Sequence, residues 1–314
     1  MAHITVLNKQ DLQSILSQYG IVGILSHKVL SGGSENTNYL VMTKAQSFVL
    51  TICEQKSLKN TEELAKLLIY LNQNNFNTSK LVKTINGELT SSFNQKPVML
   101  KRFIEGEIKE DIPDSILFHL GIELSKLHLI KAPSYLPETL SYGIDNFDEL
   151  KQIAAETSFY KWLNNTKSII KKHMSIDLPK ALIHSDIFYN NIIINSNKNQ
   201  ATIMDFEEAC YYYRVFDIGM MIVGTCTNQD KINVNIKKAS SLLRGYQQNI
   251  NLQEIEKRAL KAFTIYAATA TGFWRFQNFN YKNIIPSMKN HHLEMKNLAD
   301  NIMKLPDDCF YHFL

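Results

Sequence analysis

Two aspartates and an asparagine stand at a defined spacing in the second half of this chain. Asp186 is followed five residues later by Asn191, and Asp205 comes fourteen residues after Asn191. Metal-assisted phosphoryl transfer requires such a set. One carboxylate orients the attacking hydroxyl and accepts its proton, while an amide oxygen and a second carboxylate hold Mg2+ against the phosphates. The three residues are therefore candidates for these roles.

Short apolar runs give this spacing a defined local structure. Residues 181–183, 192–194 and 201–204 are apolar, and the polar residues 195–200 separate the last two runs. Runs of this length between turn-forming residues predict a strand, a loop and then a β-hairpin that ends on Asp205. Ordinary turn or helix-capping acids are the alternative interpretation of both aspartates.

The length and composition indicate a globular protein of about two lobes. The 314 residues allow a large core. Hydrophobic residues make up 45% and charged residues 20%, as in ordinary soluble proteins. The net charge is only +4, and no run of lysine and arginine is dense enough for a nucleic-acid face, so no nucleic-acid partner is expected. The mild positive charge is compatible with a small anionic ligand such as a nucleotide.

Nothing in the sequence predicts export or membrane insertion. The first eight residues have neither the basic nor the apolar region of a signal peptide, and no apolar stretch approaches the ~20 residues of a membrane span. The four cysteines are scattered, without the spacing of a zinc site. A cytoplasmic protein with reduced thiols and no membrane partner is therefore expected.

The first hundred residues are typical of a small α+β lobe. A helix is expected between Asn8 and Gly20, because apolar residues at helical spacing follow an N-capping residue. Antiparallel strands around one further helix suit this kind of lobe. The expected strands are 24–30, 38–42, 47–53, 81–83 and 97–104, and the expected second helix is 62–71.

After Gly106 the pattern becomes mostly helical, interrupted only by the hairpin. The expected fold class is therefore α+β with two lobes, residues 1–103 forming the N-terminal lobe and 104–314 the C-terminal lobe. A hinge is expected at about 100–106. The expected helices are 116–129, 160–172, 215–225, 236–247, 252–276 and 288–303.

A second candidate site lies between the first two expected strands. Gly32 and Gly33 are followed by Ser34, Asn36 and Asn38. Paired glycines among small hydroxyl and amide residues can turn backbone N–H groups toward phosphate oxygens. A glycine pair is equally common in an ordinary hairpin turn, so the residues alone leave both interpretations open.

These motifs together resemble the aminoglycoside phosphotransferase-like kinase superfamily, relatives of protein kinases that phosphorylate small alcohols. Residues 34–39, Ser-Glu-Asn-Thr-Asn-Tyr, and 48–51, Phe-Val-Leu-Thr, are most similar to the second-type homoserine kinases. Residues 204–219 are similar to the choline and ethanolamine kinases. The resemblance extends from about Ile24 to the C-terminal helices. It implies a two-lobed, protein-kinase-like fold with ATP and Mg2+ as cofactors.

The resemblance implies a role for each residue of the catalytic stretch. Asp186 takes the role of catalytic base, and Asn191 and Asp205 take the metal roles. His184 is expected to brace the catalytic loop rather than to contact the substrate. Asp217, on the following helix, is expected to tie that helix to the loop.

The same resemblance assigns nucleotide binding to the N-terminal lobe. Most members carry a lysine or arginine on the third strand, whereas Thr51 stands here, as in second-type homoserine kinases. The phosphate cation is therefore unassigned, with Lys44, Lys56 and Lys101 as candidates. Backbone groups of residues 99–102 are expected to meet the adenine edge. The expected nucleotide-binding residues are Gly32, Gly33, Ser34, Asn36, Asn38, Thr51, Met99, Lys101 and Phe103.

The acceptor pocket is expected in the C-terminal lobe. A zwitterionic amino alcohol such as homoserine needs an acid and an arginine, whereas choline needs an acid and an aromatic cage. Arg275 favours the first and Trp274 with the tyrosines the second, although simple packing is the alternative for each aromatic residue. Arg214 is expected to pair with an acid such as Asp217. The expected substrate-binding residues are Glu207, Tyr211, Trp274 and Arg275.

We therefore expect a kinase that transfers the γ-phosphate of ATP to the hydroxyl of a small amino alcohol. Homoserine is the first choice of acceptor, and choline, ethanolamine or an aminoglycoside is the alternative. A catalytically silent kinase-like binding module is a further alternative, because the strand lysine is missing. The intact Asp186, Asn191 and Asp205 favour the enzyme.

Overall fold

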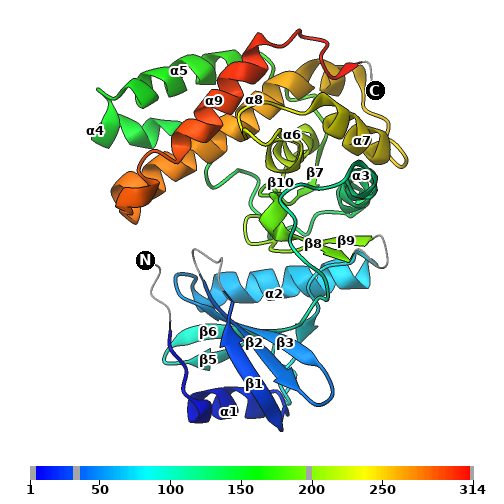
Figure 1. Ribbon diagram of the computed structural model, residues 1–314, viewed down its shortest axis with the longest axis vertical. Helices are drawn as coiled ribbons and strands as arrows, with labels where there is room; N and C mark the ends of the chain where they lie inside the picture. The colour runs from blue at the N-terminus through cyan, green and yellow to red at the C-terminus, as the bar shows by residue number, and fades with distance from the viewer. Residues whose placement is uncertain (1–4, 31–35, 196–199, 312–314) are drawn as a thin grey trace. The chain divides into compact units, whose positions relative to one another are not determined.

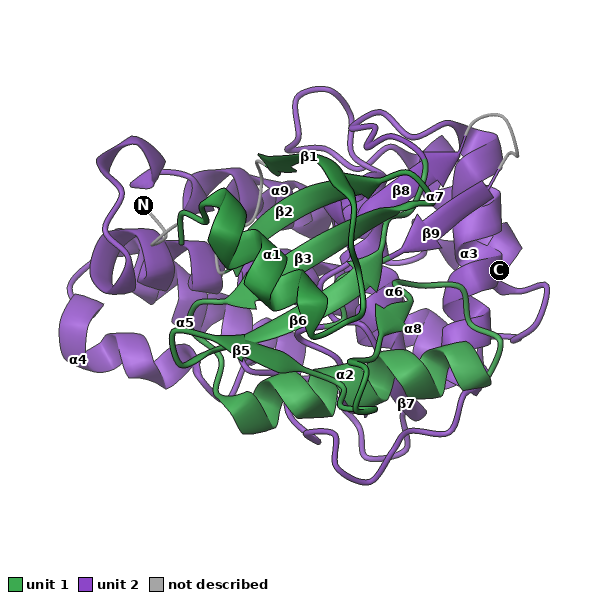
Figure 2. Cartoon of the chain, turned by 90° about the horizontal axis from the view of Figure 1, so that it is seen from below, with its two compact units in different colours: residues 1–105, 204–206 green, residues 106–203, 207–314 purple. Residues whose placement is uncertain are grey.

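A computed structural model describes residues 5–30, 36–195 and 200–311 (Figure 1). The chain forms two compact units, unit 1 with residues 1–105 and 204–206 and unit 2 with residues 106–203 and 207–314 (Figure 2). Unit 1 contains an antiparallel sheet and unit 2 is mostly helical, so the predicted α+β class is confirmed. The expected phosphate-binding residues 32–34 lie outside the described residues.

Unit 1 is built around its sheet. The two helices described in this unit are α1 (Lys9–Ser17) and α2 (Leu58–Gln73). Helix α2 begins one turn earlier than the sequence predicts, because the Ser57 side chain accepts a hydrogen bond from the Asn60 N–H and caps the helix there. The strands follow the spatial order β1 (Ile24–Val29), β2 (Asn36–Thr43), β3 (Ser47–Cys53), β6 (Lys96–Arg102) and β4 (Leu81–Val82), and β5 (Ser91–Phe93) also pairs with β6.

One face of this sheet forms the core of unit 1. Directly paired residues on antiparallel strands point to the same face, so Tyr39, Leu50 and Leu100 lie side by side on β2, β3 and β6. They share a hydrophobic core with Leu12 and Leu16 of α1. Figure 2 shows α1 lying across these strands. The residues that alternate with these three along the strands point to the opposite face of the sheet.

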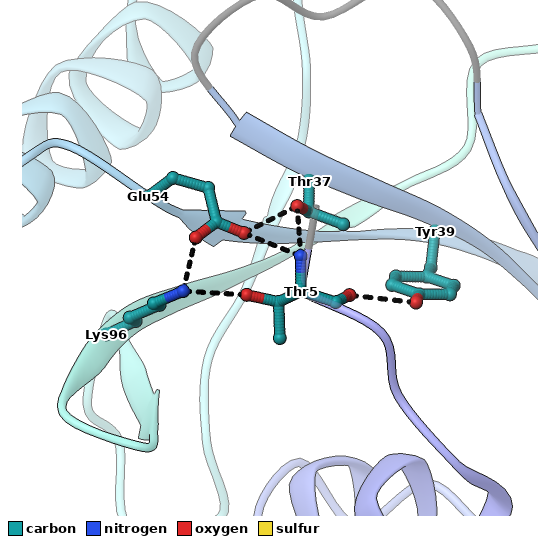
Figure 3. Close-up of polar contacts among 5 residues, drawn as sticks. All are labelled: Thr5, Thr37, Tyr39, Glu54 and Lys96. Carbon is teal, nitrogen blue, oxygen red and sulfur yellow. Dashed lines mark hydrogen bonds and ion pairs between the residues drawn. The ribbon is translucent and has the colours of Figure 1, made fainter. Parts of the chain in front are cut away.

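A polar network ties the segment before α1 to the sheet (Figure 3). Lys96 Nζ lies 2.5 Å from Glu54 Oε2 and 2.8 Å from Thr5 Oγ1. The Thr5 N–H donates to Glu54 Oε1 at 3.1 Å and to Thr37 Oγ1 at 3.0 Å. Burial opposes ionisation of Glu54, but the hydrogen bonds from the surrounding donors outweigh it and lower the pKa of this acid to about 2. A charged carboxylate therefore joins β2, β3, β6 and the N-terminal segment.

Unit 2 contains the strand, loop and hairpin that the sequence predicts. The strand is β7 (Lys180–Ile183), and the hairpin consists of β8 (Ile192–Asn195) and β9 (Gln200–Ile203). Strand β10 (Cys210–Tyr213) pairs with β7 and was not predicted. Its partner lies far away in the sequence, so this pairing leaves no local pattern.

The remainder of unit 2 is helical. Helices α8 and α9 run side by side (Figure 1). Helix α9 begins four residues later than the expected residue 288, because Pro286–Met288 form a separate 3-10 turn. Within the described part of the chain, no helix is both long and apolar enough to cross a bilayer. The α-helices are α3 (Asp114–Leu129), α4 (Lys151–Ala154), α5 (Ser158–Lys171), α6 (Arg214–Thr225), α7 (Ile236–Tyr246), α8 (Glu254–Gln277) and α9 (His292–Lys304).

Helices α3 and α7 cross at two glycines. A Cβ atom added to Gly245 would lie 1.9 Å from Phe118 O, and one added to Gly121 would lie 2.1 Å from Leu242 O. Both distances are far below van der Waals contact, so only glycine fits at either position. The backbones of the two helices are therefore in direct contact.

Candidate active site

The loop between β7 and β8 is held by the first turn of α6. The Asp217 side chain is fully buried, and its Oδ2 accepts the His184 N–H at 2.8 Å. Its Oδ1 accepts the Ser185 N–H at 2.7 Å. Ser185 has a φ of +70°, in the left-handed region that side chains other than glycine rarely adopt. The carboxylate thus fixes the loop in a strained backbone conformation immediately before Asp186.

Helix α6 contacts the loop again two turns later. A Cβ added to Gly224 would lie 2.1 Å from Ile187 O and 2.8 Å from the Phe188 Cα. Gly224 stands seven residues after Asp217, so both lie on the same face of the helix. The loop backbone is therefore held against one face of α6 on both sides of Asp186.

Three further hydrogen bonds fix the start of the loop. Tyr142 Oη donates to Ser185 O at 2.5 Å, and Ser185 Oγ donates to Glu208 O at 2.8 Å. Burial raises the pKa of Tyr142 well above its usual value, so its hydroxyl keeps the proton that it donates. The Asp186 N–H donates to His184 Nδ1 at 3.2 Å. His184 therefore contacts the backbone of the predicted catalytic base.

Asn191 ends the loop and turns back onto Asp186. Its Nδ2 donates to Asp186 O at 2.8 Å and to Asp186 Oδ2 at 3.2 Å. Asn191 is buried, whereas Asp186 is partly exposed. Because the amide nitrogen faces Asp186, the amide oxygen is the atom of Asn191 that can bind a cation.

Asp205 follows the hairpin that begins directly after Asn191. Ile192 pairs with Ile203, and Asp205 stands two residues beyond Ile203. Its side chain is exposed and its φ is +70°. Residues 204–206 belong to unit 1, where Phe206 packs edge-on against another phenylalanine. In the sequence, the β8–β9 hairpin thus lies between the two predicted metal residues, Asn191 and Asp205.

The oxygen donors of Asn191 and Asp205 suit Mg2+. This ion prefers oxygen ligands and is usually held by one or two protein groups together with phosphate oxygens and water. Among the residues that the structure describes, no three His, Cys, Asp or Glu side chains gather around a common point. Each of the two oxygens is of the type that Mg2+ binds, and the metal role of both residues stays a prediction.

Five expected nucleotide-binding residues, Lys101 among them, share the sheet face opposite α1. Asn38 pairs directly with Thr51, and Thr51 pairs with Met99. Asn36 pairs with Cys53 one step further along the same face. Thr51 is buried, and its Oγ1 donates to Asn38 Oδ1 at 2.7 Å. Thr51 therefore orients the Asn38 side chain and supplies no positive charge.

Strand β6 includes the first three residues of the expected hinge, 100–106. Strand β6 continues through Arg102, and the Phe103 N–H donates to Ser47 O at 3.0 Å. The backbones of Met99 and Lys101 are therefore part of the β-ladders, and their role at an adenine edge stays a prediction. Phe103 is 37% exposed and is the first residue beyond the strand.

The candidate phosphate cations occupy different places in unit 1. Lys101 pairs directly with Val49 and so lies on the same sheet face as Thr51. Lys44 lies in the turn between β2 and β3, at the opposite end of β2 from Asn36. Lys44 is therefore badly placed for the segment between β1 and β2. Lys56 precedes α2 and is partly buried.

Arg275 and Glu294 form an ion pair beside the loop. Arg275 Nη1 lies 3.1 Å from Glu294 Oε1, so α8 and α9 each contribute one charge. The guanidinium of Arg275 also lies over the ring of Phe188, 5.9 Å from its centroid. Phe188 follows Asp186 by two residues. The sequence alone does not indicate Glu294, because nothing local shows which acid on α9 faces α8.

The aromatic candidates have other partners. Trp274 packs edge-on against Phe279 with ring centroids 5.6 Å apart. The ring of Tyr211 lies 5.9 Å from the ammonium of Lys180, the first residue of β7 and the one furthest from the loop. Glu207 is partly buried where the chain re-enters unit 2. Trp274 and Tyr211 thus contact different side chains.

Arg214 does not pair with Asp217. Its Nε and Nη2 lie 2.6 Å from Oε1 and Oε2 of Glu256 on α8, and Glu256 is fully buried. The predicted partner was wrong because the carboxylate of Asp217 already accepts the loop N–H groups. The bidentate pair instead joins α6 to α8.

Comparison with known proteins identifies the family. Residues 26–249 match the model of the "Phosphotransferase enzyme family". The chain belongs to this family. The homoserine kinase of Nitrobacter hamburgensis is 26% identical over 267 residues, which cover 83% of this chain and 81% of that protein. The homoserine kinase of Zymomonas mobilis is 27% identical over 82% of this chain and 83% of that protein.

Solved structures show the same fold. A microcompartment-associated aminopropanol kinase matches this phosphotransferase with a TM-score of 0.72 at 16% identity, over 95% of this chain and 97% of that one. A choline/ethanolamine kinase family protein from Mesorhizobium loti matches with a TM-score of 0.71 at 14% identity, over 95% and 96% of the two chains. The predicted resemblance and the kinase-like fold are therefore confirmed. The enzyme is a small-molecule kinase of the ATP-dependent type.

Proposed function

We propose that this phosphotransferase transfers the γ-phosphate of ATP to the side-chain hydroxyl of homoserine. The observation that carries the proposal is the pair of hydrogen bonds from Asn191 Nδ2 to Asp186. They fix the direction of the Asp186 carboxylate in a loop that Asp217 holds on α6. A partly exposed, oriented carboxylate is what a kinase needs to accept the proton of an incoming hydroxyl.

Each residue of the loop has a defined part in this reaction. Asp186 orients the substrate hydroxyl and accepts its proton as the oxygen attacks the phosphorus. The Asn191 amide oxygen and the Asp205 carboxylate would hold Mg2+, which when bound neutralises charge on the phosphates. On unit 1, Asn36 and Asn38 follow the segment that we expect to contact the nucleotide phosphates.

The ion pair beside the loop supports an amino acid as the acceptor. Homoserine carries a carboxylate, which a guanidinium recognises well, and an ammonium, which needs an acid. Arg275 and Glu294 supply both charges, and Phe188 joins them to the loop. A quaternary ammonium would instead need an aromatic cage, and Trp274 and Tyr211 contact other side chains. The homoserine kinases among the relatives support the same acceptor.

A coupled assay of ADP release with Mg2+ tests the acceptor. We expect homoserine to give kcat/KM at least about tenfold above choline, ethanolamine, 3-amino-1-propanol and an aminoglycoside, because a missing charged contact costs about this much or more. Faster turnover of another alcohol than of homoserine would refute the assignment. ATP binding without turnover of any alcohol would identify a silent binding module.

Two variants test the residues. Asp186→Asn should lower kcat by roughly 100-fold or more with ATP affinity unchanged, because it removes the base and keeps the shape. Unchanged kcat would remove Asp186 from this role. Arg275→Ala should reduce kcat/KM for homoserine strongly and leave 3-amino-1-propanol unaffected, since this alcohol is homoserine without its carboxylate. Equal losses for both substrates would contradict carboxylate recognition by Arg275.

A further inference from the structure

A short hairpin between α6 and α7 carries Lys231 at its tip. Thr227 and Val234 form an isolated β-bridge at the base of this hairpin. At the tip, Asp230 Oδ1 accepts the Ile232 N–H at 3.0 Å. Lys231 stands between these two residues with a φ of +60°, in the left-handed region. A defined turn therefore presents the lysine side chain.

Two contacts hold the tip of the hairpin. Asn301 Nδ2 of α9 donates to Ile232 O at 3.0 Å. The Lys231 ammonium forms an ion pair with Glu110. Glu110 follows by three residues an isolated bridge to β8, the strand that begins directly after Asn191. The hairpin tip is therefore tied to α9 and, through Lys231, to the segment that pairs with β8.

The charge of Lys231 reaches the ion pair of Arg275 and Glu294. The hydrogen bond with Glu110 raises the pKa of Lys231, and the carboxylate of Glu294 adds to this effect. Burial lowers the pKa of His291, and the positive charges of Arg275 and Lys231 lower it further. The His291 O also accepts from Arg275 Nη1 at 3.4 Å. The Lys231 ammonium is therefore an electrostatic neighbour of the proposed acceptor site.

These groups give the proposed acceptor site an excess of positive charge. Arg275 and Glu294 offset each other, because they form an ion pair at 3.1 Å. Glu110 offsets Lys231 only in part, since both side chains are about half exposed and water screens their attraction. A homoserine zwitterion has no net charge, so the excess charge repels it little. An alcohol that carries an ammonium and no carboxylate is a cation and is repelled.

We propose that Lys231 is a specificity-determining residue that disfavours acceptors with a net positive charge. Discrimination then has a repulsive component besides the attraction between Arg275 and the carboxylate of the substrate. The proposal rests on the proposed function, because it assumes that the acceptor binds at Arg275 and Glu294. It implies that removing one charge improves the use of a poor substrate.

Steady-state kinetics of Lys231→Met test the repulsion. The variant should raise kcat/KM for 3-amino-1-propanol about fivefold, because a like charge nearby at a protein surface weakens binding by roughly this factor. The kcat/KM for homoserine should not rise, since the zwitterion has no net charge. Lys231→Arg keeps the charge and should behave as wild type with both alcohols. Loss of a merely structural contact would not produce a gain with one substrate alone.

Two further variants complete the comparison. Glu110→Gln removes the partner charge of Lys231 and should lower kcat/KM for 3-amino-1-propanol, the direction opposite to that of Lys231→Met. Lys237→Met is the matched control, because it removes the same charge from a pair with Asp114 in which the lysine is 86% exposed. It should leave kcat/KM for both alcohols at the wild-type values.

The pKa of His291, measured by NMR on carbon-13-labelled histidine, gives a readout that needs no turnover, and a His291→Gln variant assigns the signal. This pKa should rise in Lys231→Met and stay at the wild-type value in Lys237→Met, since the charge of Lys231 lowers it. An unchanged pKa of His291 in Lys231→Met would overturn the proposal.

The kinetic outcomes separate this proposal from the acceptor assignment. If wild type prefers homoserine but folded Lys231→Met shows no gain with 3-amino-1-propanol, the acceptor assignment stands and the role of Lys231 is refuted. If wild type prefers another alcohol but Lys231→Met still gains activity with 3-amino-1-propanol, the homoserine assignment fails and the repulsion by Lys231 stands.

Discussion

Removing the charge of Glu54 should destabilise the protein in a pH-dependent way. The Glu54 side chain is 4% exposed and forms an ion pair with Lys96 at 2.5 Å. Its pKa falls from an ordinary value of 4.5 to about 2 in the folded state, because hydrogen bonds outweigh the cost of burial. Each unit of pKa difference corresponds to about 1.4 kcal/mol, so the ionised group contributes about 3 kcal/mol. Glu54→Gln should lose up to this amount near neutral pH.

The sign of the pH dependence follows from the lowered pKa. The contribution is complete above the unfolded value of 4.5 and is lost as the pH falls toward 2. Relative to neutral pH, the stability advantage of wild type over Glu54→Gln should shrink by about 1 kcal/mol at pH 4 and by about 2 kcal/mol at pH 3.

Urea unfolding at several pH values measures this difference directly. Glu88→Gln is the matched control, because Glu88 lies exposed in a turn of the same unit, and its unfolding free energy should stay within about 0.5 kcal/mol of wild type. A difference between wild type and Glu54→Gln that stays constant from about pH 7 to pH 4 would refute the reasoning. A difference below about 1 kcal/mol at neutral pH would show that the network contributes little.

Three further changes probe the packing of unit 2. Gly245→Ala should cost about 3 kcal/mol in urea unfolding because its Cβ would overlap Phe118 O, and a loss below about 0.5 kcal/mol would contradict the close helix contact. Glu256→Gln leaves the charge of Arg214 half-paired and should also cost about 3 kcal/mol, whereas unchanged stability would exclude a strong pair. Burial raises the pKa of Cys226 to about 12, so iodoacetamide at about pH 8 should modify this thiol only after unfolding. Rapid modification of Cys226 in the native protein, located by mass spectrometry, would contradict this burial.

The elements predicted best are those whose signal is local. Short apolar runs and a turn indicate the segment from β7 to Asp205. A capping box at Asn8 and Asp11 indicates the N-terminus of α1. Strand β10 is missed because its partner β7 is distant in the sequence. The register that makes Asn38 and Thr51 neighbours likewise appears only when the strands are paired.

Pairing between distant side chains is the feature that the sequence predicts least well. Asp217 stands three residues from Arg214, yet the arginine reaches Glu256 instead, 42 residues away. The contacts of His128 with Tyr246 and Asp217 likewise show no local motif, because they join residues of three helices. The contact of Gly121 and Gly245 with facing backbones is equally invisible in composition. Such features depend on packing geometry, which a single sequence does not encode in any local window.

The spacing of Asp217 and Gly224 on α6 limits how this helix can vary in length. Seven residues span close to two turns, so both positions meet the loop from one side. A single inserted or deleted residue between them would rotate Gly224 by about 100° around the helix axis and place a side chain against the loop backbone. Apolar residues 220–223 can exchange for others of similar volume, but their number cannot change. We therefore expect substitutions, and no insertions or deletions, to be tolerated between these two positions.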